Sequence, residues 1–425
     1  MNEKPQLVFI HCADLHLDSP FEGLHQIDSH IASVLRDATF QAFEKVIDFT
    51  IAENCDFLLI SGDVYNEADR SLRAKLRFRD QLQRAMEAGI PCFVAHGNHD
   101  PLSGWEAEIS LPDGVTRFGG EKVELIPFRE GKDDRAHIYG ISFPVREVRE
   151  NLAKRFRRES NSVFSIAVLH CNLGGNTEYD NYAPCVLDDL MASQFDYWAL
   201  GHIHTRCVVR EQNPVIIYPG NIQGRNITET GPRGCYLIKV WDLDTITVNF
   251  LETDVVRWFE ETIDISTLKT LDDLWDEMTL HRENVRARAA GKASILRLHL
   301  MGRGDLHREL HSPKGRDTDW SAILREGEPD RSDFVWVESV DGKTRPCLDI
   351  EKRKEVDDFV GDFLRISEMY CYEATRNQCL QNILSHRPEW RIIAREIEKM
   401  TKDDVLDIFR KAEIYGLDHL LSEED

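Results

Sequence analysis

The sequence lacks the features that mark membrane, secreted and thiol-rich proteins. No apolar run approaches the roughly 20 residues that a helix needs to cross a bilayer, and residues 1–6 are polar where a secretory leader would turn apolar. The 10 cysteines form no C-x-x-C pair, which argues against a zinc ribbon and favours buried, reduced thiols. We therefore expect a cytoplasmic protein without a membrane partner.

Basic residues are also in short supply. The chain has 52 Lys and Arg against 75 Asp and Glu, a formal net charge of −23. Proteins that bind nucleic acid contact its phosphates through cations, so this balance counts against that class of partner. It does not exclude it, because bound metal ions cancel the charge of their carboxylate ligands and basic residues can gather on one face.

The overall composition is that of a globular protein with two or three domains, since 42% of the 425 residues are hydrophobic and 30% are charged. Over the first hundred residues, apolar strand-like runs alternate with segments of helical periodicity, and each run ends in polar residues. The expected strands are 7–11, 56–60 and 90–95, and the expected helices are 31–54 and 70–88. Such alternation is typical of an α/β sheet with its site at the carboxyl ends of the strands.

Short strands follow in close succession beyond residue 113. They are expected at 122–126, 136–141, 163–170, 197–201, 215–218, 234–241 and 245–251. The two halves together predict two sheets packed between helical layers, an α-β-β-α sandwich.

The pattern changes again near Thr253. A predicted helix at 270–291 and predicted strands at 294–300 and 334–340 indicate a small α+β unit, and from Asp349 onward the sequence is helical and strongly charged. We therefore predict three parts, which are 1–252, 253–345 and 346–425.

Side chains of the kind that bind metals follow five of the predicted strands. They are Asp14 and His16, then Asp63, then Asn98, then His170, and finally His202 and His204. Each motif is weak by itself, because a lone histidine is more often a core residue than a ligand. Their shared position after apolar strands makes a chance origin improbable, since all of them can meet at one edge of the fold. Imidazole, carboxylate and amide groups without thiolates suit manganese, iron or zinc.

The order of these motifs, D-x-H, G-D, G-N-H-D, H and G-H-x-H, resembles that of the calcineurin-like metallophosphoesterase superfamily over about the first half of the chain. Within it, F-I-H-C-A-D-L-H-L-D-S-P at 9–20 and Y-P-G-N-I-Q-G-R at 218–225 resemble the SbcD-type DNA-repair exonucleases, in particular the YhaO-like branch. The resemblance implies two divalent metal ions. Mn2+ is the first choice, with Fe, Zn and Mg as alternatives.

The resemblance also implies a role for each residue. One metal would be held by Asp14, His16 and His204, the other by Asn98, His170 and His202, with Asp63 bridging the two. His99 would stay free of metal near the scissile phosphate, as a transition-state stabiliser or proton donor, and Asp100 would orient it. Two ions about 3.5–4 Å apart activate a water and neutralise the charge that develops on phosphate oxygens.

Two further features concern the substrate. Asn66 stands where many of the resembled nucleases carry histidine or aspartate, and it cannot transfer a proton, which puts substrate preference and nuclease efficiency in doubt. Arg70, Arg73 and Arg77 lie on one face of the predicted helix 70–88. They form either a track for the DNA backbone or an ordinary solvated helix face.

The parts beyond the catalytic half imply partners through the same resemblance. Residues 253–345 match the capping domain of the resembled nucleases in position and size and would help to grip DNA. The helical segment would attach to a coiled-coil ATPase of the SbcC type, and a homodimer is implied through N-terminal helices. Its apolar stripes form that interface or pack within their own domain: Val356, Phe359, Val360, Phe363, Leu364, Val405, Leu406, Ile408 and Phe409.

Three functions are compatible with this sequence. The leading one is a metal-dependent DNA exonuclease or endonuclease of double-strand-break repair. The second keeps the chemistry but hydrolyses cyclic nucleotides, nucleotides or phosphoproteins, for which the roughly 170 residues after the catalytic part have no evident use. The third is a catalytically silent scaffold, which would be expected to lose metal ligands, whereas all of them are present.

Overall fold

The computed structural model describes residues 4–24, 28–66, 71–103, 110–175, 179–242, 245–316, 318–370 and 402–422. The chain divides into two compact units. The first consists of Met1–Glu261, Thr279–Leu298 and Trp320–Val340, and the second of Thr262–Met278, His299–Asp319 and Asp341–Asp425. The three-part division made from the sequence stays a prediction.

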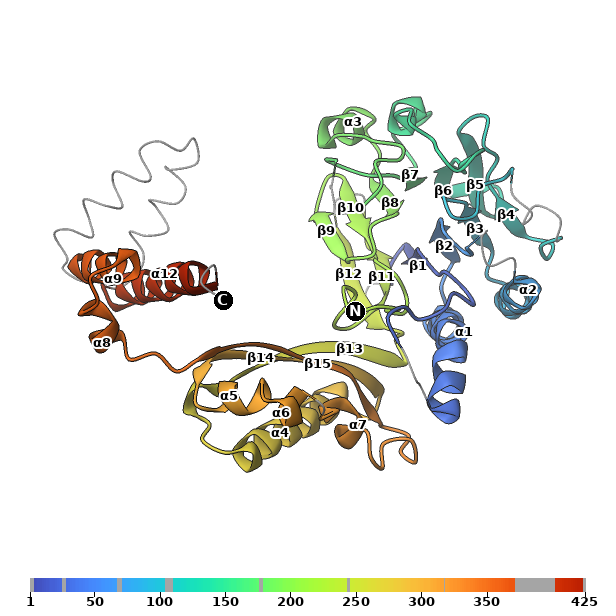
Figure 1. The fold of residues 1–425 in the computed structure, drawn as a ribbon. Helices are drawn as coiled ribbons and strands as arrows, with labels where there is room; N and C mark the ends of the chain where they lie inside the picture. The colour runs from blue at the N-terminus through green and yellow to red at the C-terminus, as the bar shows by residue number, and fades with distance from the viewer. Residues whose placement is uncertain are drawn as a thin grey trace. The chain divides into compact units, whose positions relative to one another are not determined.

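The first unit contains two six-stranded sheets (Figure 1). The first sheet has the order β12-β11-β1-β2-β3-β4, formed by Ile246–Glu252, Gly234–Val240, Leu7–Cys12, Phe57–Ser61, Cys92–Ala95 and Val115–Arg117. The second has the order β5-β6-β7-β8-β10-β9, formed by Glu124–Glu130, Asp133–Gly140, Phe164–His170, Tyr197–Gly201, Val215–Tyr218 and Cys207–Arg210. Strands β1 to β4 pair in parallel, as do β6, β7, β8 and β10.

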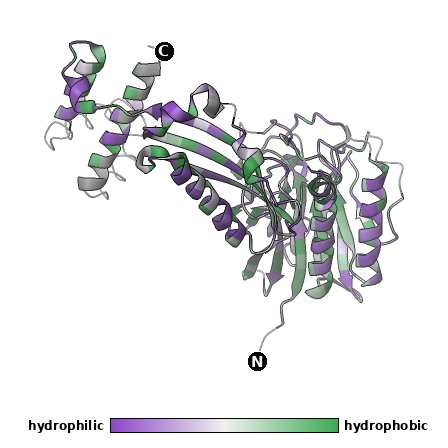
Figure 2. Ribbon diagram, turned by 60° about the horizontal axis from the view of Figure 1, so that its bottom comes forward, coloured by the Kyte–Doolittle hydropathy of each residue, from purple (hydrophilic) through white to green (hydrophobic). Residues whose placement is uncertain are grey.

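The alternation of side chains along β1 explains the layers. Val8 and Ile10 pack into a core with the helices α1 (Ser29–Ala52) and α2 (Leu72–Glu87). Leu7 and Phe9 point the other way, into a core shared with the second sheet. The outer face of the second sheet packs on η3 (Leu152–Arg155) and α3 (Leu187–Ala192). The predicted α-β-β-α sandwich is therefore confirmed, and Figure 2 shows hydrophobic residues running through its strands.

The two long helices begin and end where their local chemistry dictates. Asp28 caps α1 by accepting hydrogen bonds from the backbone N–H of His30 and Ile31. Ser71 caps α2 in the same way through the N–H of Ala74. Gly89 follows α2 with φ +79°, a left-handed conformation that glycine adopts without strain. Both predicted helices are present within two residues of their expected ends, apart from residue 70, which lies outside the described residues.

Three strands were not predicted. These are β4 (Val115–Arg117), β9 (Cys207–Arg210) and β13 (Val256–Asp264). The first two are short edge strands with partly exposed side chains, so they carry little hydrophobic pattern. Strand β13 carries the adjacent Glu260 and Glu261 and was interpreted as part of a domain boundary. Their pairing partners, which the sequence does not reveal, stabilise all three.

A third sheet has the order β13-β14-β15, with β14 at Ala293–Gly304 and β15 at Val335–Pro346. Helix α4 (Leu271–Ala289) precedes β14, and the short helices α5 (Leu306–Leu310), α6 (Pro313–Arg316) and α7 (Trp320–Leu324) precede β15. The predicted small α+β unit is present, with longer strands than expected.

The described part of the C-terminal segment is helical, as expected. It contains α8 (Ile350–Lys354), α9 (Phe359–Met369) and α12 (Lys402–Ser422). Val360 and Leu364 pack with Leu417 in a small core, so part of the apolar stripe packs within its own unit. Phe359 and Ile408 are exposed, and the side chain of Val405 lies outside the described residues. No described helix has both the length and the apolar character needed to cross a bilayer.

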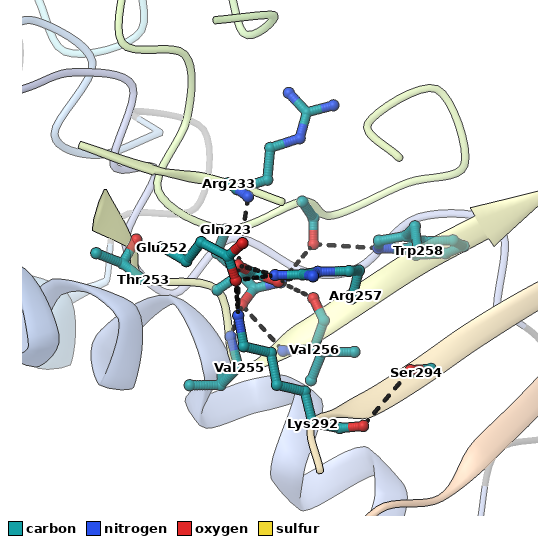
Figure 3. Close-up of polar contacts among 12 residues, drawn as sticks. Gln223, Arg233, Glu252, Thr253, Val255, Val256, Arg257, Trp258, Lys292 and Ser294 are labelled. Carbon is teal, nitrogen blue, oxygen red and sulfur yellow. Dashed lines mark hydrogen bonds and ion pairs between the residues drawn. The ribbon is translucent and has the colours of Figure 1, made fainter. Parts of the chain in front are cut away.

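A buried ion network joins the end of β12 to β13 (Figure 3). Asp254 is fully buried, and its carboxylate accepts hydrogen bonds from Arg257 Nε at 2.8 Å and from Lys292 Nζ at 3.0 Å. Glu252 accepts from the same two cations at 2.6 and 2.7 Å. The backbone of Arg233 also contacts Asp254, at 3.3 Å. The two carboxylates therefore neutralise the charges of Arg257 and Lys292 at the point where the chain leaves the sandwich.

We predict that Asp254→Ala lowers the free energy of unfolding by about 3–5 kcal/mol, because it removes the fully buried partner of Arg257 and leaves only the half-exposed Glu252. Glu252→Gln is the matched control. Glu252 is half-exposed, with 45% of its side chain accessible, so we expect a loss below about 1 kcal/mol there. Urea unfolding followed by circular dichroism measures the stability of both variants. Equal losses would show that the buried Asp254 stabilises the fold no more than the half-exposed Glu252.

Candidate active site

The loops that follow five strands meet at one place in the first unit. They bring together Asp14 after β1, Asp63 after β2, Asn98 after β3, His170 at the end of β7, and His202 after β8. Backbone hydrogen bonds hold the loops to one another. Asp14 N–H donates to Gly62 O at 3.1 Å, and His202 N–H donates to the carboxylate of Asp14 at 3.1 Å. The strand-exit prediction is therefore met by loops from both sheets.

One group of potential ligand atoms comes from Asp14, His16 and His204. These atoms lie within 4.8 Å of one another. His16 Nε2 faces His204 Nε2 at 3.1 Å and lies 3.8 Å from Asp63 Oδ2. The structure thus places these side chains together as the sequence predicted for one metal.

A second group surrounds Asn98 Oδ1. This oxygen lies 3.0 Å from His170 Nε2 and 3.1 Å from His202 Nδ1. His170 Nε2 in turn lies 3.3 Å from Asp63 Oδ2. Since Asp63 Oδ2 faces both groups, Asp63 occupies the position that a bridging carboxylate requires.

Each of the four histidines uses its other ring nitrogen as a hydrogen-bond donor. His16 Nδ1 donates to Asn66 Oδ1 at 2.8 Å and His170 Nδ1 to Ser61 O at 2.9 Å. His202 Nε2 donates to Asp180 O at 2.7 Å and His204 Nδ1 to Glu229 Oε1 at 2.6 Å. All four partners are acceptors, so each outer nitrogen carries a proton and each inner nitrogen is the one left to bind a metal ion. This arrangement is characteristic of histidines that bind metals.

The electrostatics of the site also suit a cation. Burial raises the pKa of Asp14 to about 6. Burial opposes ionisation of Asp63 as well, but His170 and His99 outweigh it and hold the pKa of Asp63 well below its usual range. Burial likewise disfavours the charged form of His170, yet Asp63 and Asp14 raise its pKa to about 9. Nearby positive charge would therefore stabilise the ionised form of these two buried carboxylates. The residues fit two divalent ions.

Burial has the opposite consequence for two other ligands. It lowers the pKa of His202 to about 4 and that of His16 well below its usual value. Both imidazoles are thus neutral near pH 7, which is the form that binds a metal.

Three glycines make room for the His170 ring. A Cβ on Gly62 would lie 2.3 Å from His170 Nδ1, and one on Gly201 would lie 1.9 Å from Ser61 O and 2.9 Å from His170 Nδ1. A Cβ on Gly97 would lie 2.3 Å from Asp63 Oδ1 and 2.7 Å from His170 Nε2. The glycines of the three G-containing motifs therefore serve one purpose, which is close packing of the loops around one imidazole.

Four of the metal-binding positions have a backbone conformation that side chains rarely adopt. The φ angles are +51° at Asp14, +43° at His16, +51° at Asp63 and +102° at His202. Such conformations cost about 1–3 kcal/mol each and persist where the surroundings enforce them. Here the loops turn sharply after each strand, which points the side chains back toward the common centre.

His99 and Asp100 differ in their placement. His99 is only half-buried, its N–H donates to Asp63 Oδ1 at 2.9 Å, and its ring centroid lies 5.0 Å from that of His16. This is compatible with its predicted place beside the phosphate. Asp100 does not hold the His99 ring as expected. It is fully buried, and its carboxylate bonds to His96 and to the N–H groups of Gly97 and Val64, so it stabilises the loop instead.

The other proposed substrate residues also have partners inside the fold. The amide oxygen of Asn66 serves His16, which makes Asn66 a positioning residue and leaves only its NH2 group for a substrate. Arg73 forms ion pairs with Asp18 and Asp37, and the guanidinium of Arg77 lies 4.9 Å from the centroid of the Phe40 ring. These contacts favour the structural interpretation over a DNA track. Arg70 lies outside the described residues.

Glu229 is a site residue that no pattern in the sequence indicates. Its side chain is 6% exposed, and although burial opposes its ionisation, the hydrogen bond from His204 lowers its pKa to about 2. It follows His204 by 25 residues in a loop without strand or helix pattern. Only folding of the segment between β10 and β11 brings it to the metal-binding loops.

We predict that Mn2+ raises the melting temperature of the wild type but not of Gly97→Ala, because the added methyl group displaces Asp63 and His170. Ligand binding at 100 times Kd contributes about 2.7 kcal/mol, which is several degrees for a protein of this size. Gly342→Ala is the control, since a Cβ there meets no atom within 4 Å. Thermal shift and metal content per chain measure the effect. A normal Mn2+ response in Gly97→Ala would show that the close packing is not required.

Comparison with known proteins agrees with this site. The model of the calcineurin-like phosphoesterase family matches residues 7–206, and that of the middle domain of metallophosphoesterase YhaO matches residues 258–345. The uncharacterised metallophosphoesterase YhaO of Bacillus subtilis is 34% identical over 408 residues, which are 96% of each chain.

More distant similarities cover part of the chain. The DNA double-strand break repair protein Mre11 of Sulfurisphaera tokodaii is 28% identical over 267 residues, 58% of this chain and 66% of that protein. A dimetal phosphatase of Danio rerio aligns in structure with a TM-score of 0.35 and 12% identity, over 59% of this chain and 97% of the other; a likeness this low adds nothing to the argument. The chain therefore belongs to the calcineurin-like metallophosphoesterases and carries a YhaO-type middle domain.

Proposed function

We propose that this metallophosphoesterase is a two-metal phosphodiesterase whose substrate is DNA, working with a coiled-coil ATPase of the SbcC type in double-strand-break repair. The observation that carries the proposal is the set of four imidazoles around Asp63, each fixed by an outer acceptor. Mn2+ is the proposed metal, with Fe, Zn and Mg as alternatives. When bound, such ions neutralise charge on phosphate oxygens and activate the attacking water.

The residues of the chain perform the remaining tasks. Asp14, His16, Asp63 and His204 would hold one ion, and Asp63, Asn98, His170 and His202 the other. Asn66 and Glu229 keep the inner nitrogens of His16 and His204 aimed at the centre. His99 is half-buried beside Asp63, so its ring can reach a phosphate at the site and donate a proton to the leaving oxygen.

DNA is proposed as the substrate because of the relatives. The Mre11 protein of Sulfurisphaera tokodaii, named for DNA double-strand break repair, is similar to this chain over 267 residues, which are 58% of its length. The middle domain offers a separate element of about 90 residues in the same chain, which a hydrolase of small phosphoesters would not require.

A small phosphodiester is the alternative substrate, and two observations favour it. The net charge is −23, and two arginines of the basic helix have partners within the fold: Arg73 pairs with Asp18 and Asp37, and Arg77 lies over the ring of Phe40. Without a basic track, DNA would depend on the metals and on surfaces outside α2. A nucleotide or cyclic nucleotide needs only the metal centre.

We predict Mn2+-dependent degradation of end-labelled linear double-stranded DNA by the wild type and none by Asp63→Asn, which removes the shared negative charge. The assay is run in parallel with bis(4-nitrophenyl) phosphate. Hydrolysis of the small diester without DNA cleavage would favour the alternative substrate, and equal DNA cleavage by Asp63→Asn would trace the activity to another protein.

We predict that His99→Ala retains both metals but loses about 10²–10⁴-fold in kcat on the small diester, the usual range for loss of a proton donor. His99 supplies no inner ligand atom, so metal content and the Mn2+ thermal shift should match the wild type. Undiminished turnover would remove His99 from the mechanism.

A further inference from the structure

Arg225 is held on a rigid loop that begins after β10. Its backbone N–H donates to Glu229 Oε2 at 2.7 Å, and its carbonyl accepts from Glu22 N–H at 2.9 Å. The preceding Gly224 carbonyl accepts from Trp258 Nε1 at 3.1 Å. Gln223, shown in Figure 3, is 2% exposed and bonds to the backbone of both Val255 and Val256. The position of this arginine is therefore fixed before any ligand arrives.

The guanidinium of Arg225 has unused hydrogen-bonding capacity. Its side chain is 11% exposed, and its buried Nε finds no hydrogen-bond partner among the described residues. Nη2 forms an ion pair with Glu229 Oε1 at 3.9 Å, a distance too long for a hydrogen bond. A buried N–H group without a hydrogen-bond partner destabilises the fold. This unpaired N–H group of Arg225 lies next to the residues of the candidate metal site.

A short chain of contacts links Arg225 to the metal centre. Glu229 Oε1 accepts from His204 Nδ1 at 2.6 Å, and His204 Nε2 faces His16 Nε2 at 3.1 Å. After burial, the positive charge of Arg225 is the strongest influence lowering the pKa of His16. The guanidinium therefore lies on the side of the site where Asp14, His16 and His204 converge.

Support of Glu229 does not account for this side chain. Both carboxylate oxygens of Glu229 already accept short hydrogen bonds, one from His204 and one from the backbone N–H of Arg225. Any residue except proline would supply that backbone bond. The guanidinium is paired with Glu229 only at 3.9 Å and makes no hydrogen bond to it, so its donors can bind another anion.

We propose that Arg225 binds the substrate phosphate, donating from its guanidinium to non-bridging oxygens that the metal ions leave free. Arginine is suited to this role because its planar donors match two phosphate oxygens at once. This inference rests on the proposed phosphodiester chemistry at the same site and names the residue that recognises the phosphate. It applies equally to DNA and to a small diester.

The test is calorimetric titration of inorganic phosphate into the Mn2+-loaded protein. We expect Arg225→Met, which keeps the length of the side chain, to raise the Kd for phosphate roughly 10- to 100-fold, as for loss of one charge-assisted interaction. Arg225→Lys should recover part of the affinity. Arg149→Met is the control for net charge, since Arg149 is 81% exposed and pairs only with Glu147 among the described residues.

Each outcome decides the matter. An unchanged Kd in Arg225→Met, or a wild type that does not bind phosphate, would overturn the proposal. Loss of metal from Arg225→Met, matched by Glu229→Gln, would assign Arg225 to support of His204 and also overturn it. A wild type that binds phosphate through Arg225 but does not cleave DNA would contradict the DNA substrate alone.

Discussion

The hydrogen bond that each metal-site histidine makes away from the centre is the interaction on which the rest of the site depends. Asn66, Ser61, Asp180 and Glu229 each present an acceptor to one outer ring nitrogen. These contacts fix the tautomer and the ring direction, and only then do the inner lone pairs converge. The acceptors come from loops of both sheets, so the sandwich must form completely before the site exists. Two of these acceptors, Ser61 O and Asp180 O, are backbone carbonyls, which no side-chain motif could reveal.

The convergence of these side chains requires strained backbone conformations. Sharp turns after the strands put Asp14, His16, Asp63 and His202 at positive φ, and the close approach of the loops excludes a Cβ at the glycines around His170. Strain of this kind is tolerated where the surrounding structure over-determines the conformation. The large core between the two sheets supplies that constraint, because its strands are buried along most of their length.

The cations of the protein fall into two groups: those paired with carboxylates within the fold, and Arg225 beside the candidate metal site. Arg73 is committed to acidic residues near α1, and Arg257 and Lys292 to the buried Asp254 where the chain leaves the sandwich. These cations stabilise the fold and are not available to a polyanion. Arg225 is different, because its backbone is fixed while its guanidinium retains unpaired donors beside the metal-binding residues.

The sequence by itself determined the strand–helix alternation, the two-sheet sandwich and the set of candidate metal ligands, because each follows from a local pattern: apolar period, capping residue or motif after a strand. It did not reveal β13, the loop-stabilising contacts of Asp100, or the roles of Asn66 and Glu229. Those were decided by tertiary structure, since they depend on which loops meet across the two sheets. Hydrogen-bond partners distant in sequence leave no periodic trace, whereas burial of a strand or helix face does. Glu229, 25 residues from the histidine that it holds, became a site residue only when the loop between β10 and β11 folded back against the end of β8.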